Sequence, residues 1–176
     1  MSDELVIFGG RTYGLLFLIL LISRGMDFLS TWIATPNMVL EGNPLAKMLG
    51  WKWGSFVNLL LCGVFAAWPL AAIIIGTTSV LVAARNFQVA WLMRSLGEEN
   101  YRDWYLERLR QTGLPLYLFC LLGQTLLNAC VGAALMYFTG DSLIPFAVGF
   151  GIVGYALAVT FYTLLALWRI RRAPAE

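Results

Sequence analysis

The chain has 176 residues, of which 60% are hydrophobic and only 12% are charged. Soluble domains carry about 25% charged residues, and a soluble core of this size cannot hide so much apolar surface. The formal net charge of +2 is too small to indicate a nucleic-acid partner, and the absence of histidine excludes imidazole acid-base chemistry and histidine-ligated metals. This composition predicts one integral membrane domain, residues 1–176, surrounded by the lipid bilayer.

The first apolar stretch covers residues 12–35. It contains Arg24 and Asp27 and lacks a small-residue cleavage site, so we interpret it as a retained membrane helix rather than a signal peptide. Asn43 and Pro44 are typical of a helix N-cap and first helical position, and they predict a short helix that ends near Leu49.

The second apolar stretch, residues 54–84, follows an aromatic and cationic cluster at Trp51, Lys52 and Trp53 that is typical of the water-lipid boundary. Its length allows a tilted or bent helix, and Pro69 supplies a kink site. We therefore predict a single membrane helix here.

A polar segment, residues 98–111, places aromatic and charged residues at helical spacing and predicts an amphipathic helix on the membrane surface. Two further apolar stretches follow, residues 116–138 and 143–168, joined by a tight turn. The predicted fold is all-α: a polytopic bundle of four transmembrane helices with a cytoplasmic amphipathic helix.

Orientation follows from the distribution of positive charge, because Lys and Arg near helix ends stay in the cytoplasm. With four crossings, Lys47 and Lys52 fall on the outer side. The other side then holds most of the basic residues: Arg85, Arg94, Arg102, Arg108, Arg110, Arg169, Arg171 and Arg172. This count predicts a protein of the inner (plasma) membrane with both termini in the cytoplasm.

Arg24 and Asp27 are the charged residues at membrane depth, where an ionised side chain costs at least about 2.5 to 3.5 kcal/mol and faces a partner or water. Three residues apart on one helix, they can form an ion pair on a single face. At about 1.5 Å per residue, Asp27 lies about 12 Å and Arg24 about 16 Å from the end of the first stretch.

Other polar residues fall near the same depth on the remaining predicted helices, and they suggest one shared cluster with Arg24 and Asp27. The additional candidates are Asn58, Gln124, Asn128 and Tyr155. Interhelical hydrogen bonds at about 0.6 to 2 kcal/mol each are the structural alternative for the neutral residues.

A second set of polar residues, Glu41 to Pro44, follows the first stretch directly and offers a carboxylate, a glycine and a capped helix start. Such a turn can bind an amine or a hard cation, or it can be a capped turn with a solvated Glu41. Asp27 and Thr31, followed by Glu41, Asn43 and Pro44, resemble the first-helix pattern of a family of small prokaryotic membrane proteins of unknown function. This resemblance implies that Asp27 and Glu41 act as one unit and implies no activity.

Two groups of small residues have structural interpretations. The cysteines Cys62, Cys120 and Cys130 lack redox or metal spacing and indicate packing, and no cofactor or metal site is predicted. The last apolar stretch carries a small-residue stripe that favours close helix packing within the bundle or in a homodimer or membrane-protein complex: Ala147, Gly151, Gly154 and Ala158.

Three functions agree with these patterns. The first is the binding or transport of a small polar or charged solute at Arg24 and Asp27. The second is an accessory subunit of a larger membrane complex. The third is a membrane-embedded enzyme acting on a lipid-linked substrate, with Asp27 or Glu41 as its acid-base or metal-binding group, so that enzymatic activity is left open.

Overall fold

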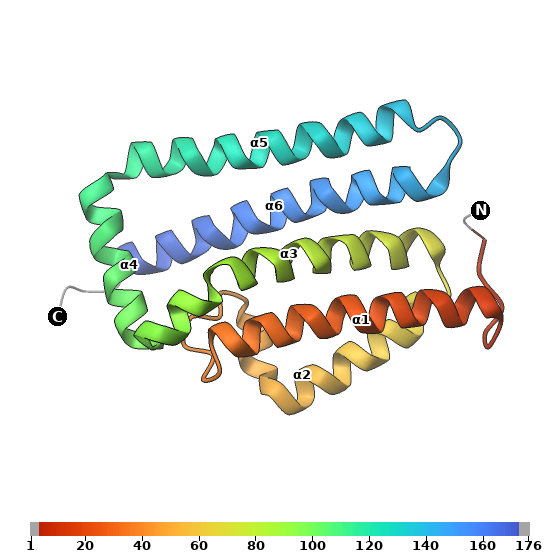
Figure 1. Cartoon of the computed structure of the whole chain (residues 1–176), viewed down its shortest axis with the longest axis horizontal. Helices are drawn as coiled ribbons and strands as arrows, with labels where there is room; N and C mark the ends of the chain where they lie inside the picture. Colours follow the sequence, from red (N-terminus) through yellow and green to blue (C-terminus); the bar gives the residue numbers. More distant parts are fainter. Residues whose placement is uncertain (1–3, 173–176) are drawn as a thin grey trace.

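The computed structural model describes residues 4–172, and all regular secondary structure in that part of the chain is helical (Figure 1). The elements, in chain order, are α1 (Arg11–Ala34), α2 (Pro44–Phe65), α3 (Pro69–Leu96), α4 (Glu98–Thr112), α5 (Leu114–Phe138) and α6 (Leu143–Arg172). Five of them, all except α4, are long and apolar enough to cross a membrane. The expected all-α fold is thus confirmed, and these five helices have the length and composition of membrane spans.

The single helix predicted over residues 54–84 is wrong, because the chain turns back between Phe65 and Pro69. Proline has no backbone N–H and suits the first position of a helix, so Pro69 begins α3 instead of kinking a continuous helix. The turn adds one membrane-length helix to the four expected, and the predicted four-helix bundle is not confirmed.

α1 and α3 pack along matched seams of small and apolar residues. The buried residues of α3 are spaced alternately four and three apart, which keeps one face toward a neighbour: Ala72, Gly76, Ser79, Ala83 and, after a longer step, Ala90. Those of α1 follow the same spacing: Leu16, Leu20, Ser23, Ser30 and Ala34. Small side chains on α3 let the two backbones approach closely.

α6 lies on the other side of α3, and α5 packs on α6 as the outermost helix (Figure 1). A Cβ atom added at Gly151 would come within 2.9 Å of the Ile74 carbonyl oxygen, so α6 touches the backbone of α3 there. Thr78 Oγ1 also donates to the Gly151 carbonyl at 3.0 Å. At Gly151, the predicted small-residue stripe of α6 therefore packs against α3. Ala147 of the same stripe is fully buried within the chain.

α2 bends at Gly50, whose φ of 65° lies in the left-handed region that favours glycine. The expected short helix from Pro44 is confirmed up to this bend, and the Asn43 side chain caps it by accepting from the Leu45 N–H at 3.0 Å. Beyond the bend, Gly54 faces the Phe28 ring of α1. Only Gly54 and Cys62 of α2 are fully buried, so α2 is the least embedded of the helices that surround α1.

The bundle has two ends, and α4 crosses one of them (Figure 1). The loop between α1 and α2, the whole of α4 and the end of α6 lie at this end, which we call the α4 end. The N-terminal segment lies at the opposite end, where the Val6 N–H donates to the Ala67 carbonyl at 2.9 Å. The five long helices alternate in direction, so α1 begins and α6 ends at opposite ends of the bundle (Figure 1). The cytoplasmic location expected for both termini stays a prediction.

Glu98 joins the start of α4 to the loop after α1. Its buried carboxylate accepts from the Asn37 N–H at 2.7 Å, from the Val39 N–H at 2.8 Å and from the Thr35 hydroxyl. Burial raises the pKa of Glu98, but these hydrogen bonds together outweigh burial and hold its pKa below the ordinary value. Glu98 therefore remains ionised near neutral pH and anchors α4 across the α4 end of the bundle.

Candidate functional site

The centre of the candidate site is the Arg24 guanidinium, which joins three helices. Nη1 donates to Asp27 Oδ2 at 2.8 Å on the same helix, as the three-residue spacing predicted. Nε donates to Asn58 Oδ1 of α2 at 2.8 Å, and Nη2 contacts the same oxygen. Nη1 also donates to Ser79 Oγ of α3 at 3.2 Å. The structure thus brings Arg24, Asp27 and Asn58 together, as the sequence predicted.

Local structure holds these acceptors in place. The Asn58 amide nitrogen donates to the Gly54 carbonyl at 2.8 Å, which turns its oxygen toward Arg24. The Ser30 hydroxyl donates to the Asp27 carbonyl at 2.8 Å, one turn along α1. The site is therefore built on helices, whose backbones fix the direction of each side chain.

Ser79 and Asn86 of α3 belong to this polar layer, and neither residue was predicted from the sequence. The Asn86 amide donates to Ser30 Oγ at 3.3 Å and to Thr31 Oγ1 at 3.2 Å, which brings the predicted Thr31 into the layer. Two sequence features indicated that the chain reverses here. Residues 54–84 exceed the roughly 20 residues of one crossing, and Pro69 lies inside this stretch. A chain reversal at Pro69 returns Ser79 to the level of Asn58.

Glu41 and Asn43 lie in the loop between α1 and α2. The Glu41 carboxylate accepts from the Asn43 N–H at 2.7 Å and is half-buried. Asp27 is thus the carboxyl group that pairs with Arg24, and Glu41 is a second carboxyl group in the loop that follows α1.

Three predicted members do not join the cluster. Gln124 is exposed on α5, and the Asn128 amide donates to the Gln124 carbonyl of its own helix at 2.8 Å. α3 and α6 lie between α5 and α1, so equal depth does not bring these residues together (Figure 1). Tyr155 is buried on α6 and is not among the hydrogen-bond partners of Arg24 or Asp27 in the described part of the chain.

The ion pair between Arg24 and Asp27 is only partly buried. The Arg24 side chain keeps 30% and the Asp27 side chain 17% of its surface exposed. Among the described residues, the Asp27 carboxylate accepts a hydrogen bond only at Oδ2, so Oδ1 can accept from a further donor. A partly open carboxylate held beside a fixed cation can accept a hydrogen bond from an amine or a hydroxyl group.

Within residues 4–172, no group of three or more Cys, Asp or Glu side chains is placed to hold a metal ion. The three cysteines are unpaired thiols, with Cys62 buried and Cys120 and Cys130 exposed on the apolar surface of α5. The site residues themselves are hydrogen-bonding groups suited to a polar organic ligand.

No family model, no curated protein and no solved structure matches this chain. The resemblance of Asp27, Thr31, Glu41, Asn43 and Pro44 to a family of unknown function therefore stays a prediction.

Proposed function

We propose that the protein binds a small solute bearing an amine at the Arg24 and Asp27 layer and passes it along α2. The observation that carries this proposal is the Asp27 carboxyl group, which is paired with Arg24 and keeps 17% of its side chain exposed. Its Oδ1 accepts no hydrogen bond from the described residues, which favours a ligand that donates one, such as an amine. The hydroxyl group of Thr31, half-buried on the same helix, can also contact a hydrogen-bonding ligand.

α2 is the element whose movement would open this layer. It covers Arg24 through Asn58, bends at Gly50 and buries little of its own surface. Directly after this bend, α2 is held by a hydrogen bond from Trp51 Nε1 to the Pro36 carbonyl at 2.8 Å. A swing of α2 about Gly50 would expose Asp27 without disturbing the seam between α1 and α3.

For location, we propose the plasma membrane with the α4 end in the cytoplasm. All Lys and Arg residues of the sequence except Arg11, Arg24 and Arg85 belong to segments at this end. Basic residues near helix ends remain in the cytoplasm. With five crossings, the N-terminus then lies on the outer side. Lys47 and Lys52 move to the cytoplasmic side, so the excess of positive charge on that side is larger than with four crossings.

The test of solute binding is thermal unfolding of the purified protein in lipid nanodiscs with methylamine, putrescine, choline or guanidinium as chloride salts. We expect at least one of these cations to raise the unfolding temperature of the wild type. Glu41→Gln should keep the wild-type stability, because a Gln oxygen can still accept from the Asn43 N–H, but it should lose the shift. Asp27→Asn should lose the shift as well.

Asp141→Asn is the matched control, because Asp141 is exposed in the turn before α6 at the opposite end of the bundle. It should retain the shift. Equal shifts in Glu41→Gln, Asp27→Asn and the wild type would overturn the proposal. Absence of any shift in the wild type would favour the accessory-subunit alternative.

A further inference from the structure

The hollow at the α4 end is a feature separate from the Arg24 layer. A cavity of about 150 Å³ lies between the end of α1 and the junction of α3 with α4, and a second of about 400 Å³ adjoins it. They share Asn37, Gly97 and Glu98 as lining residues. Each is far larger than the roughly 30 Å³ that one water molecule occupies in the liquid.

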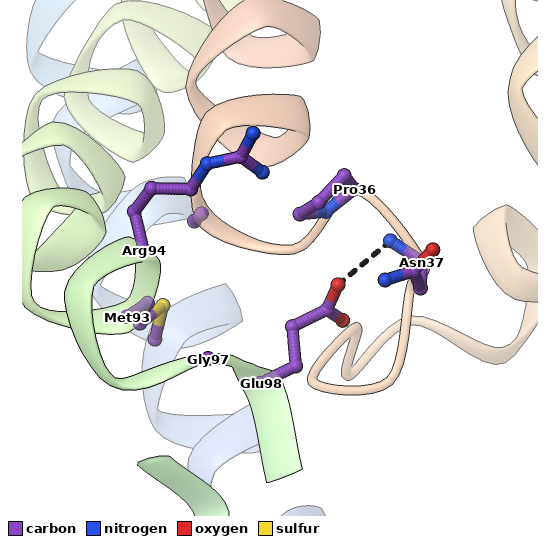
Figure 2. Close-up of a pocket in the computed structure, with 7 residues that line it drawn as sticks. Pro36, Asn37, Met93, Arg94, Gly97 and Glu98 are labelled. Carbon is purple, nitrogen blue, oxygen red and sulfur yellow. Dashed lines mark hydrogen bonds between the residues drawn. The ribbon is translucent and has the colours of Figure 1, made fainter. Parts of the chain in front are cut away.

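Charges of both signs line this hollow. Arg94 lines the first cavity, and Figure 2 shows its side chain extending beside the end of α1. Among the described residues, Arg94 has no hydrogen bond or ion pair, so its guanidinium is available to an anion. Figure 2 shows the Glu98 carboxylate turned toward Asn37. Glu99 lines the second cavity.

The depth of the hollow matches the lipid head groups. About 30 Å of hydrocarbon takes about 20 residues of helix, so α3 leaves the hydrocarbon near residue 88 when it enters at Pro69. The Arg94 backbone then lies about 9 Å beyond that boundary, and its side chain is long enough to reach back into the head-group layer. The apolar lining residues Ala34 and Met93 come from the membrane side of the same cavity.

We propose that this hollow binds a phosphate ester carrying a primary amine, in the form of a phosphatidylethanolamine head group. Arg94 contacts the phosphate, and the exposed Glu99 carboxylate accepts hydrogen bonds from the ammonium group. A choline head group has no N–H to donate, and an anionic glycerol head group would face two carboxylates. The ethanolamine head group matches both ends of the hollow.

The test compares lipid retention by native mass spectrometry after detergent extraction into an equimolar mixture of dioleoyl phosphatidylethanolamine, phosphatidylglycerol and phosphatidylcholine. We expect the wild type to retain phosphatidylethanolamine in preference to the other two. Arg94→Gln should lower this retention about tenfold, the effect of removing one charge-assisted contact. Glu99→Gln should reduce the preference for phosphatidylethanolamine over phosphatidylglycerol.

Arg110→Gln is the matched control, because Arg110 is an exposed arginine in the last turn of α4 and does not line either cavity. It should retain phosphatidylethanolamine like the wild type, and thermal unfolding should show that all three variants are folded. Equal retention by Arg94→Gln and Arg110→Gln would overturn the proposal, as would a preference for phosphatidylglycerol in the wild type. Displacement of the lipid by millimolar free phosphoethanolamine would overturn its assignment to a lipid and identify a soluble ester instead.

Discussion

Arg24 Nη1 lies 2.8 Å from Asp27 Oδ2 on α1, and the same guanidinium reaches Asn58 on α2 and Ser79 on α3. One cation therefore ties the loosely packed α2 to the α1 and α3 pair. Its counter-charge comes from its own helix, so the pair forms whenever α1 forms, and the contacts to the other two helices depend on tertiary packing.

Asp27→Asn should destabilise the protein more than Arg24→Gln and Asp27→Asn made together. The single change leaves a cation without its counter-charge at membrane depth, where breaking a fully buried pair costs about 3 to 5 kcal/mol. Since both side chains keep some exposure, we expect about 2 kcal/mol for the single variant. Thermal or denaturant unfolding in nanodiscs measures the difference.

The control for this pair is Asp103→Asn, which removes the partner of Arg102 in α4. That pair is 3.3 Å apart and its side chains are 56% and 68% exposed. Surface pairs contribute about 0 to 1 kcal/mol, so this variant should stay close to the wild type. A double Arg24 and Asp27 variant no more stable than Asp27→Asn would mean that the two charges do not compensate each other.

Glu98→Gln should loosen α4 from the rest of the bundle. An amide cannot accept from Asn37, Val39 and Thr35 as the carboxylate does, and hydrogen bonds to a charged group contribute about 1.5 to 3 kcal/mol. We expect a loss of about 2 kcal/mol and faster amide hydrogen exchange in α4. Glu99→Gln, at an exposed neighbouring position, should change stability by less than about 0.5 kcal/mol.

The stability of the wild type should also depend on pH through Glu98. Because its folded-state pKa lies below the ordinary value of 4.5, this stabilisation is fully present above pH 4.5 and declines as the pH falls toward the folded-state pKa. Glu98→Gln has no carboxyl group at this position, so the difference in unfolding temperature between it and the wild type should shrink below pH 4.5. A difference that stays constant down to pH 3 would contradict this linkage.

Gly151→Ala should disrupt the contact between α3 and α6. Its Cβ atom would lie 2.8 Å from Thr77 Cβ and 2.9 Å from the Ile74 carbonyl oxygen, and a backbone atom cannot move aside as a side chain can. We expect a loss of about 1 to 3 kcal/mol. Gly123→Ala, on α5 with nothing within 4 Å of the added atom, should be neutral or stabilising by up to about 1 kcal/mol.

Five crossings predict that the N-terminus and the turn before α6 are external, with the α4 end cytoplasmic. In a variant without native cysteines, an impermeant thiol reagent applied to intact cells should label Glu4→Cys and Asp141→Cys. Glu99→Cys should react only after the membrane is permeabilised. Protection of Glu4→Cys together with labelling of Asp141→Cys would favour an even number of crossings.

The sequence by itself determined the features that depend on composition or on a single helix. The membrane character follows from apolar length, and the pairing of Arg24 with Asp27 follows from three-residue spacing on α1. The Asn43 cap and the bend after Leu49 likewise depend on neighbouring residues along the chain. These features need no knowledge of which helices touch.

Only the tertiary structure decided the turn after Phe65 and the membership of the polar layer. Residues 65–69 are all apolar or proline, so hydropathy does not change where the chain reverses, and the turn is fixed by how α2 and α3 pack against α1. Depth in the membrane is a single coordinate and carries no information about lateral position. Gln124 and Asn128 therefore shared a predicted level with Arg24 yet lie on the outermost helix, whereas Ser79 and Asn86 reach the layer because their helix packs beside α1.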